Sequence, residues 1–95
     1  MTRELRLTPR FKRSFRKFVQ RSSLLRAEVQ KTLDSLSEDA LSAHLGTHKL
    51  KGNLYNLHAC SCGYDCRIIF TIERDETTNQ EYILLVDIGS HDDVY

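Results

Sequence analysis

The chain has 95 residues, of which 40% are hydrophobic and 28% are charged, a composition typical of a soluble globular protein. This length allows one hydrophobic core, so we expect a single domain over residues 1–95. No apolar run approaches the ~18 residues that a membrane helix requires, and the N-terminus has arginines but no apolar stretch of a secretory signal. We therefore expect a cytoplasmic protein with no membrane partner.

The net charge of +1 hides an uneven distribution of charge along the chain. Residues 1–31 hold ten Lys and Arg against two Glu, which gives +8, whereas residues 32–95 hold four against eleven acidic residues, which gives −7. A basic segment suits a polyphosphate or an acidic protein partner, because binding releases counterions. Charge alone slightly favours the alternative, an ordinary solvated helix face.

The N-terminal third predicts a short strand followed by two helices. Residues 3–8 alternate apolar and polar side chains, which places Leu5 and Leu7 on one face of a strand. A helix follows, because Thr8 can cap it and Pro9 suits its first turn. A second helix begins at Ser22 and Ser23, and the pair forms an α-hairpin that needs a sheet to cover. The apolar residues that recur at helical spacing are Phe11, Phe15, Phe18 and Val19 in the first helix and Leu25, Val29, Leu33 and Leu36 in the second.

The remainder predicts a loop and three strands. The segment 46–52 is bounded by glycines and is expected to be a polar, exposed loop. Strand-like segments follow at 54–60, 66–73 and 82–88, with Gly63 to Asp65 as a turn between the first two. The order β-α-α-β-β-β predicts an α+β fold, in which the α-hairpin packs on a small, mainly antiparallel sheet.

Three motifs accompany the basic α-hairpin. They are HKLKG at 48–52, DCRIIF at 65–70 and DIGSHDDVY at 87–95. In this combination the chain resembles the RelE/ParE toxin superfamily, and within it the YafQ-like mRNA interferase branch, over essentially its whole length. The resemblance implies a RelE-like fold and a toxin of a type II toxin-antitoxin system. Such a toxin enters the ribosome, cuts messenger RNA there without a cofactor, and is silenced by a cognate antitoxin in a hetero-oligomer.

The sequence also offers the side chains that RNA cleavage requires. Without a metal, this chemistry needs a base near the ribose 2'-hydroxyl, an acid near the leaving oxygen and a cation beside the phosphoryl oxygens. The candidates lie at strand ends or in flanking loops, where a sheet can present them to a ligand: His48, Asp65, Arg67, His91 and Tyr95. The resemblance implies that His48, Asp65 and His91 contribute to cleavage, with Tyr95 beside them.

Each candidate has a structural alternative. His48 could be a solvated loop residue, Arg67 could only pair with Asp65 or Asp87 across strands, and Tyr95 could pack over the sheet edge. Five basic residues are candidates for contact with RNA or the ribosome, or for ordinary solubilising charge: Arg10, Arg13, Lys17, Lys49 and Lys51.

The chain departs from the YafQ-like pattern at Ser61, where that branch has a histidine. His58 is nearby, but on a regular strand it points to the opposite face from Ser61. A neighbouring acidic position of the branch is Ala59 here. We therefore expect weaker activity, or roles redistributed among His48, Asp65 and His91.

The three cysteines lie close together at Cys60, Cys62 and Cys66. An odd number in a cytoplasmic protein predicts thiols rather than disulfides. The spacing C-x-C-x3-C lacks the paired C-x2-C of structural zinc sites, so no metal is expected.

Two other functions remain open from the sequence. One is a ParE-like inhibitor that binds DNA gyrase without catalysis, against which the histidine-rich motifs argue. The other is a catalytically weakened relative that only binds an antitoxin. The presence of Ser61 in place of the histidine of the YafQ-like pattern is consistent with this alternative.

Overall fold

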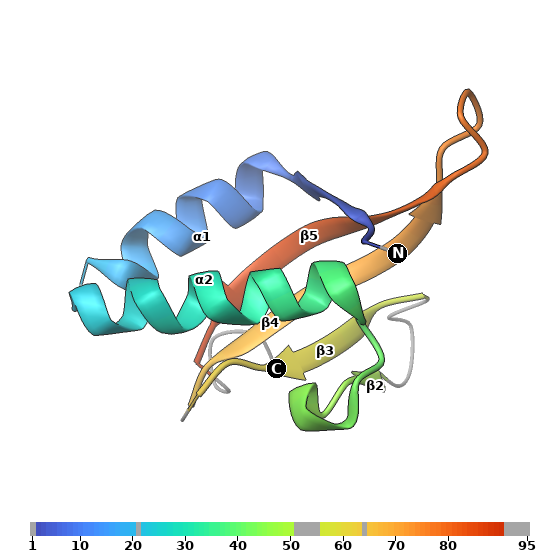
Figure 1. The fold of residues 1–95 in the computed structure, drawn as a ribbon. Helices are drawn as coiled ribbons and strands as arrows, with labels where there is room; N and C mark the ends of the chain where they lie inside the picture. Colours follow the sequence, from blue (N-terminus) through green and yellow to red (C-terminus); the bar gives the residue numbers. More distant parts are fainter. Residues whose placement is uncertain (1, 21, 51–55, 64, 91–95) are drawn as a thin grey trace.

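The computed structural model describes residues 2–20, 22–50, 56–63 and 65–90. Two helices pack on a five-stranded sheet of order β1-β5-β4-β3-β2. The elements in chain order are β1 (Glu4–Leu7), α1 (Pro9–Val19), α2 (Ser23–Glu38), the 3-10 helix η1 (Ala43–Leu45), β2 (His48–Lys49), β3 (His58–Ser61), β4 (Arg67–Arg74) and β5 (Glu81–Gly89). In Figure 1, α2 lies in front of the sheet and α1 lies above β5.

The predicted fold class is confirmed. Strands β2 to β5 pair antiparallel, and β1 pairs parallel with β5, so the described sheet is mainly antiparallel. Two elements differ from the prediction: His48 and Lys49, expected in a loop, pair with β3 as a short edge strand, and the strand expected over 54–60 begins only at His58, after Asn56 with its φ of 61°. Two residues are too few for an alternating pattern to be visible in the sequence.

The start of α1 is fixed by Thr8, as predicted. Its hydroxyl accepts a hydrogen bond from the Phe11 backbone N–H at 3.1 Å and donates to the carbonyl oxygen of Leu85 at 2.9 Å. Pro9 is the first helical residue. The cap therefore joins α1 to β5 as well as beginning the helix.

The core lies between the two helices and one face of the sheet. Of the predicted helix residues, the buried ones are Phe11, Phe18, Val19, Val29 and Leu36, and the partly buried ones are Phe15, Leu25 and Leu33. The sheet contributes Cys60, Ile68, Phe70, Ile83 and Leu85, among others. Leu5 packs against this core, whereas Leu7 is 43% exposed. Among the described segments, no helix is long and apolar enough to cross a membrane.

Candidate functional site

The face of the sheet opposite α2, here called the distal face, holds two of the predicted site residues, His48 and Arg67. One row of cross-strand neighbours runs over β2, β3, β4 and β5. A second row lies two residues away from it along β3, β4 and β5. The first row is His48, Ala59, Ile69 and Asp87, and the second is Ser61, Arg67 and Gly89. Alternation along β3 and β4 puts Ala59, Ile69 and Arg67 on one face and the row of His58 and Phe70 on the other, toward the core. A bulge after Ile69 breaks the alternation on β5, where Asp87 reaches Arg10 of α1. Two of the predicted site residues, His48 and Arg67, thus lie toward the same end of the sheet.

His48 is exposed on the edge strand β2. Its Nδ1 lies 3.1 Å from the carbonyl oxygen of Gly46. A carbonyl only accepts, so Nδ1 carries the proton in this contact, and Nε2 is the basic nitrogen of the neutral ring. This tautomer suits a proton acceptor.

Asp65 and Arg67 flank the junction between the β3–β4 turn and β4. Asp65 is exposed and has a left-handed backbone, with φ of 53°. Arg67 is half-buried, and its Nη1 donates to the carbonyl oxygen of Cys66 at 2.9 Å. The expected turn from Gly63 to Asp65 is confirmed at its two described residues, both of which have positive φ.

His48 and Arg67 share the distal face but are not in contact by register. They lie two strands and one row apart, so their Cα atoms are about 12 Å apart from standard sheet spacings. An imidazole and a long guanidinium side chain can converge on one phosphodiester across that span. Of the two alternative partners considered for Arg67, Asp87 pairs with Arg10 instead, at 3.0 Å.

Three of the predicted residues, Lys51, His91 and Tyr95, lie outside the described residues. The sheet nevertheless fixes where the chain toward His91 begins. Strand β5 ends at Gly89, the cross-strand partner of Arg67, and His91 follows two residues later in the sequence.

A polar hollow of about 320 Å³ lies between α1 and the end of β5. It is lined by Arg10, Ser14, Lys17, Phe18, Asp87, Ile88 and Gly89. Arg10 and Lys17 therefore face the same recess as the strand end that precedes His91. Arg13 is exposed on α1 but does not line this hollow, and Lys49 is exposed on β2.

Two members of this hollow, Ser14 and Asp87, were missed as site residues from the sequence. A usable signal existed for Ser14, because Arg10, Ser14 and Lys17 recur at i, i+4 and i+7 and so share one helix face. No local signal identifies Asp87, whose pairing with Arg10 depends on how α1 docks against β5.

His58 cannot replace the histidine that the YafQ-like pattern has at Ser61. It is buried and stacks on Phe70, with ring centroids 5.5 Å apart. Burial lowers the pKa of His58, and the nearby charge of Lys49 lowers it further. The pairing of β3 with β4 is regular from His58 to Ser61, as the prediction assumed, and Ser61 also lines a hollow beside Glu28 and Thr32 of α2.

The cysteine prediction was wrong for two of the three residues. Cys62 and Cys66 form a disulfide, whereas Cys60 is a buried free thiol. The β3–β4 turn brings the Cα atoms of Cys62 and Cys66 to 5.0 Å, within the range that a disulfide spans. Counting cysteines could not reveal this, because the pairing follows from the tightness of the turn. Burial raises the pKa of the Cys60 thiol to about 12.

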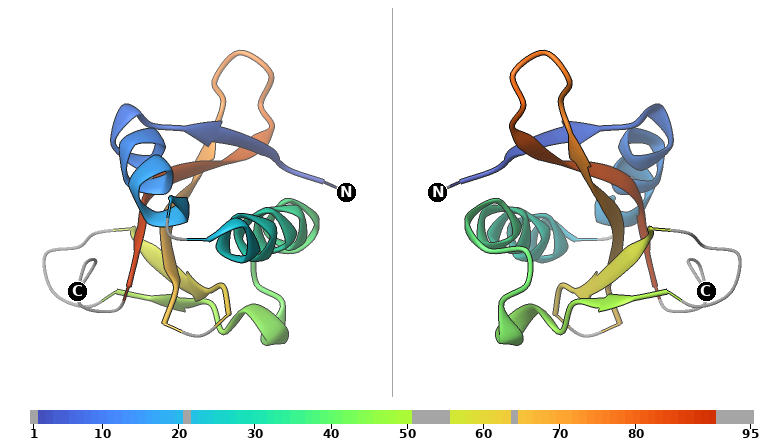
Figure 2. Two further views of the ribbon diagram at one scale, coloured as in Figure 1. Left: turned by 90° about the vertical axis from the view of Figure 1, so that its left-hand side faces the viewer. Right: turned by 90° about the vertical axis from the view of Figure 1, so that its right-hand side faces the viewer.

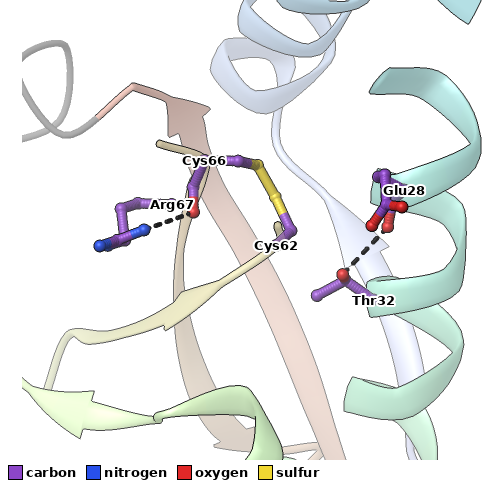
Figure 3. The surroundings of a disulfide bond; sticks show 5 residues. All are labelled: Glu28, Thr32, Cys62, Cys66 and Arg67. Carbon is purple, nitrogen blue, oxygen red and sulfur yellow. Dashed lines mark hydrogen bonds between the residues drawn. A yellow bond between two sulfur atoms is a disulfide. The ribbon is translucent and has the colours of Figure 1, made fainter. Parts of the chain in front are cut away.

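Figure 3 shows the disulfide on the side of the sheet that faces α2, near Glu28 and Thr32. The carbonyl oxygen of Cys66, on the same short turn, accepts a hydrogen bond from the Arg67 guanidinium. Within the described ranges, no group of three or more His, Cys, Asp or Glu is placed to hold a metal ion.

Comparison with known proteins places this arrangement in a family. Residues 3–95 match the family model described as "Bacterial toxin of type II toxin-antitoxin system, YafQ". No curated protein sequence matches the chain significantly.

Several solved structures share the fold. A conserved hypothetical protein from Helicobacter pylori is 23% identical, with a TM-score of 0.72 and coverage of 100% of both chains. The DinJ-YafQ toxin-antitoxin complex of E. coli gives 12% identity and a TM-score of 0.76, covering 100% of this chain and 99% of the other. The RelBE2 toxin-antitoxin complex of Mycobacterium tuberculosis gives 18% identity and a TM-score of 0.69, covering 96% and 100%. The family match extends over nearly the whole sequence, and the chain therefore belongs to the YafQ family of bacterial toxins of type II toxin-antitoxin systems.

Proposed function

We propose that this protein is a ribosome-dependent endoribonuclease that cleaves messenger RNA and so inhibits translation. The observation that carries the proposal is the shared distal face of His48 and Arg67, at the end of the sheet where β5 leads to His91. Asp65 stands at the same end, in the turn before Arg67. A base, a cation and a second titratable group are thereby collected around one surface.

The proposed reaction is attack of a ribose 2'-hydroxyl on the adjacent phosphorus. His48 accepts the hydroxyl proton at Nε2, the nitrogen left basic by the contact of Nδ1 with Gly46. Arg67 stabilises the charge that develops on the phosphoryl oxygens, and Asp65 accepts a hydrogen bond that orients the attacking hydroxyl. His91 gives a proton to the leaving 5'-oxygen, and Tyr95 stacks on a displaced base. The products are a 2',3'-cyclic phosphate and a 5'-hydroxyl.

The partners proposed for this chain are the ribosome with its message and a cognate antitoxin. Arg10 and Lys17 in the hollow beside β5, with Arg13, Lys49 and Lys51, supply positive charge for nucleic-acid phosphates. The structural relatives in toxin-antitoxin complexes support an antitoxin that binds this chain as a hetero-oligomer.

The test is cleavage of a defined message on purified ribosomes, with the message ends mapped by primer extension. We expect cuts that depend on the ribosome and that carry 2',3'-cyclic phosphate or 3'-phosphate ends. A parallel supercoiling assay with DNA gyrase distinguishes the ParE-like alternative. Intact message together with blocked supercoiling would overturn the proposal in favour of gyrase inhibition. Intact message with normal supercoiling and tight antitoxin binding would leave only the antitoxin-binding role.

A further inference from the structure

The Cys62–Cys66 disulfide encloses the turn that carries Asp65. The bond closes a loop with a sequence separation of 4, and Asp65 directly precedes Cys66. On the other side of Cys66 stands Arg67, the first residue of β4. Two of the residues proposed for RNA cleavage are thus the immediate neighbours of one bridged cysteine.

The contacts of Cys66 extend this coupling beyond the covalent bond. Its carbonyl oxygen accepts two hydrogen bonds, from the Cys62 backbone N–H at 3.0 Å and from Arg67 Nη1 at 2.9 Å. The position of the Arg67 guanidinium therefore depends on where the bridged turn holds that oxygen. Figure 3 shows the disulfide and the Arg67 contact at opposite sides of the same residue.

The backbone of Asp65 also requires support from its surroundings. A left-handed conformation, with φ of 53°, is uncommon outside glycine, and although aspartate adopts it more readily than most residues, it costs free energy that the neighbouring structure must offset. The disulfide is the covalent constraint on this turn. Without it, the turn can relax toward more favourable conformations and move the Asp65 carboxylate.

We propose that the Cys62–Cys66 pair is a redox switch that positions Asp65 and Arg67, with the disulfide as the active form and the dithiol as the slow form. The inference rests on the proposed ribonuclease function, which it deepens by adding a mode of regulation. Cys62 and Cys66 are positioning residues, since neither needs to touch the message.

The oxidant is a small-molecule disulfide such as glutathione disulfide. One cysteine thiolate attacks it, forming a mixed disulfide and releasing one thiol, and the second cysteine displaces the other thiol. The protein dithiol is oxidised by two electrons to the disulfide, and the small disulfide is reduced to two thiols. The reverse exchange with reduced glutathione restores the dithiol. In a reducing cell interior such a bond is expected to be transient, which suits a sensor rather than a permanent staple.

Two features make the switch local and specific. The bridged loop is short, so opening it restores little chain entropy to the unfolded state, and the fold should survive reduction. Cys60 stays outside the exchange, because it is 1% exposed and its thiol is held in the protonated form by burial. The sulfurs of Cys62 and Cys66 are also buried, so exchange requires the turn to open.

The experiment equilibrates the purified chain in glutathione buffers of graded reduced-to-oxidised ratio. Thiols are counted by alkylation and mass spectrometry, amide hydrogen exchange is followed at Gly63, Asp65 and Arg67, and single-turnover cleavage is measured on programmed ribosomes. The Cys62→Ser/Cys66→Ser variant removes the switch, and Cys60→Ala is the matched control that keeps it.

We expect the cleavage rate constant of the wild type to fall reversibly by about tenfold to a hundredfold on reduction, the scale of a small misplacement of catalytic groups. The ribosome concentration for half-saturation should stay unchanged, because positioning acts on the chemical step. Cys60→Ala should respond like the wild type, and the double variant should stay slow at every buffer ratio. A merely structural bridge would give no reversible response in the wild type.

Equal cleavage rates in the dithiol and disulfide forms would overturn the proposal. If neither form cleaves any message, the proposed ribonuclease function is wrong. The effect of the disulfide on the turn is then tested by amide hydrogen exchange alone. Slower exchange at Asp65 in the disulfide form would then support it, whereas equal exchange in both forms would overturn it.

Discussion

Arg10 of α1 and Asp87 of β5 form an ion pair of 3.0 Å across the hollow beside the end of the sheet. The Asp87 side chain is 11% exposed and also accepts a hydrogen bond from the Ile88 backbone N–H at 2.9 Å, whereas Arg10 is 67% exposed. The carboxylate is therefore fixed and the guanidinium is only partly held. Such a pair contributes under about 1 kcal/mol to stability, but it orients a cation toward the recess.

The charge of that hollow can be tested without disturbing the core. The double variant Arg10→Gln/Lys17→Gln should weaken ribosome binding and reduce the slope of log affinity against log salt by about two, one for each phosphate that the variant no longer neutralises. The matched control is Lys12→Gln/Arg16→Gln, which removes the same charge from exposed positions of α1 that do not line the hollow. Cosedimentation at graded salt measures both. An equal loss of affinity in the two variants would assign the effect to net charge rather than to the hollow.

The buried imidazole of His58 predicts how stability depends on pH. Its pKa is lowered in the folded state, so above the ordinary value of ~6.5 both the folded and the unfolded chain hold it neutral. As the pH falls below ~6.5, the unfolded chain binds a proton that the folded chain does not. The free energy of unfolding should then fall by up to about 1.4 kcal/mol per pH unit, until the lowered pKa of the folded state is reached.

The measurement is urea unfolding at pH values from about 5 to about 8, a range that brackets the ordinary histidine pKa of ~6.5. His58→Phe keeps an aromatic ring against Phe70 and should flatten the dependence in this window. His44→Gln, which replaces an exposed histidine, is the matched control. Identical curves for His58→Phe and the wild type would assign the slope to other groups.

The arrangement of helices and sheet, seen in two further views in Figure 2, was more predictable from the sequence than the site. The helices follow from local patterns, such as the Thr8 cap and the spacing of Phe11 and Phe18, and each pattern acts within one or two turns. The site depends instead on register between strands. His48 and Arg67 are far apart in sequence, and only the pairing through Ala59 and Ile69 places them on one face.

The two outright errors share a cause. The strand at His48 and Lys49 and the disulfide between Cys62 and Cys66 both arise from long-range or turn geometry that no residue type encodes alone. In contrast, the regular pairing of β3 that the sequence analysis assumed between His58 and Ser61 needed only local strand propensity, and it is present.

His48 and Lys49 are adjacent on β2, and they should fail in different ways. His48→Gln keeps a polar side chain but cannot take up a proton, so the single-turnover rate constant should fall by ~100-fold to ~10,000-fold while ribosome binding is retained. Lys49→Gln should instead raise the ribosome concentration for half-saturation and leave the rate constant intact, because it removes only a charge. Circular dichroism confirms folding of each variant. A wild-type rate constant in His48→Gln would move the base to another residue.

Ser61 offers a test by gain of activity. It is the cross-strand partner of Arg67 and stands where the YafQ-like pattern has a histidine. In Ser61→His the imidazole would lie beside the Arg67 guanidinium, whose charge favours the neutral form that accepts a proton. A second positioned proton carrier should raise the single-turnover rate constant by about tenfold or more, below the ~100-fold of a fully optimised group. Ser61→Asn is the matched control, since it enlarges the side chain without adding a titratable group, and it should cleave at the wild-type rate. If both variants cleave message equally, then Ser61 is not the weak point of this active site, and His48, Asp65 and His91 carry the proton transfers without it.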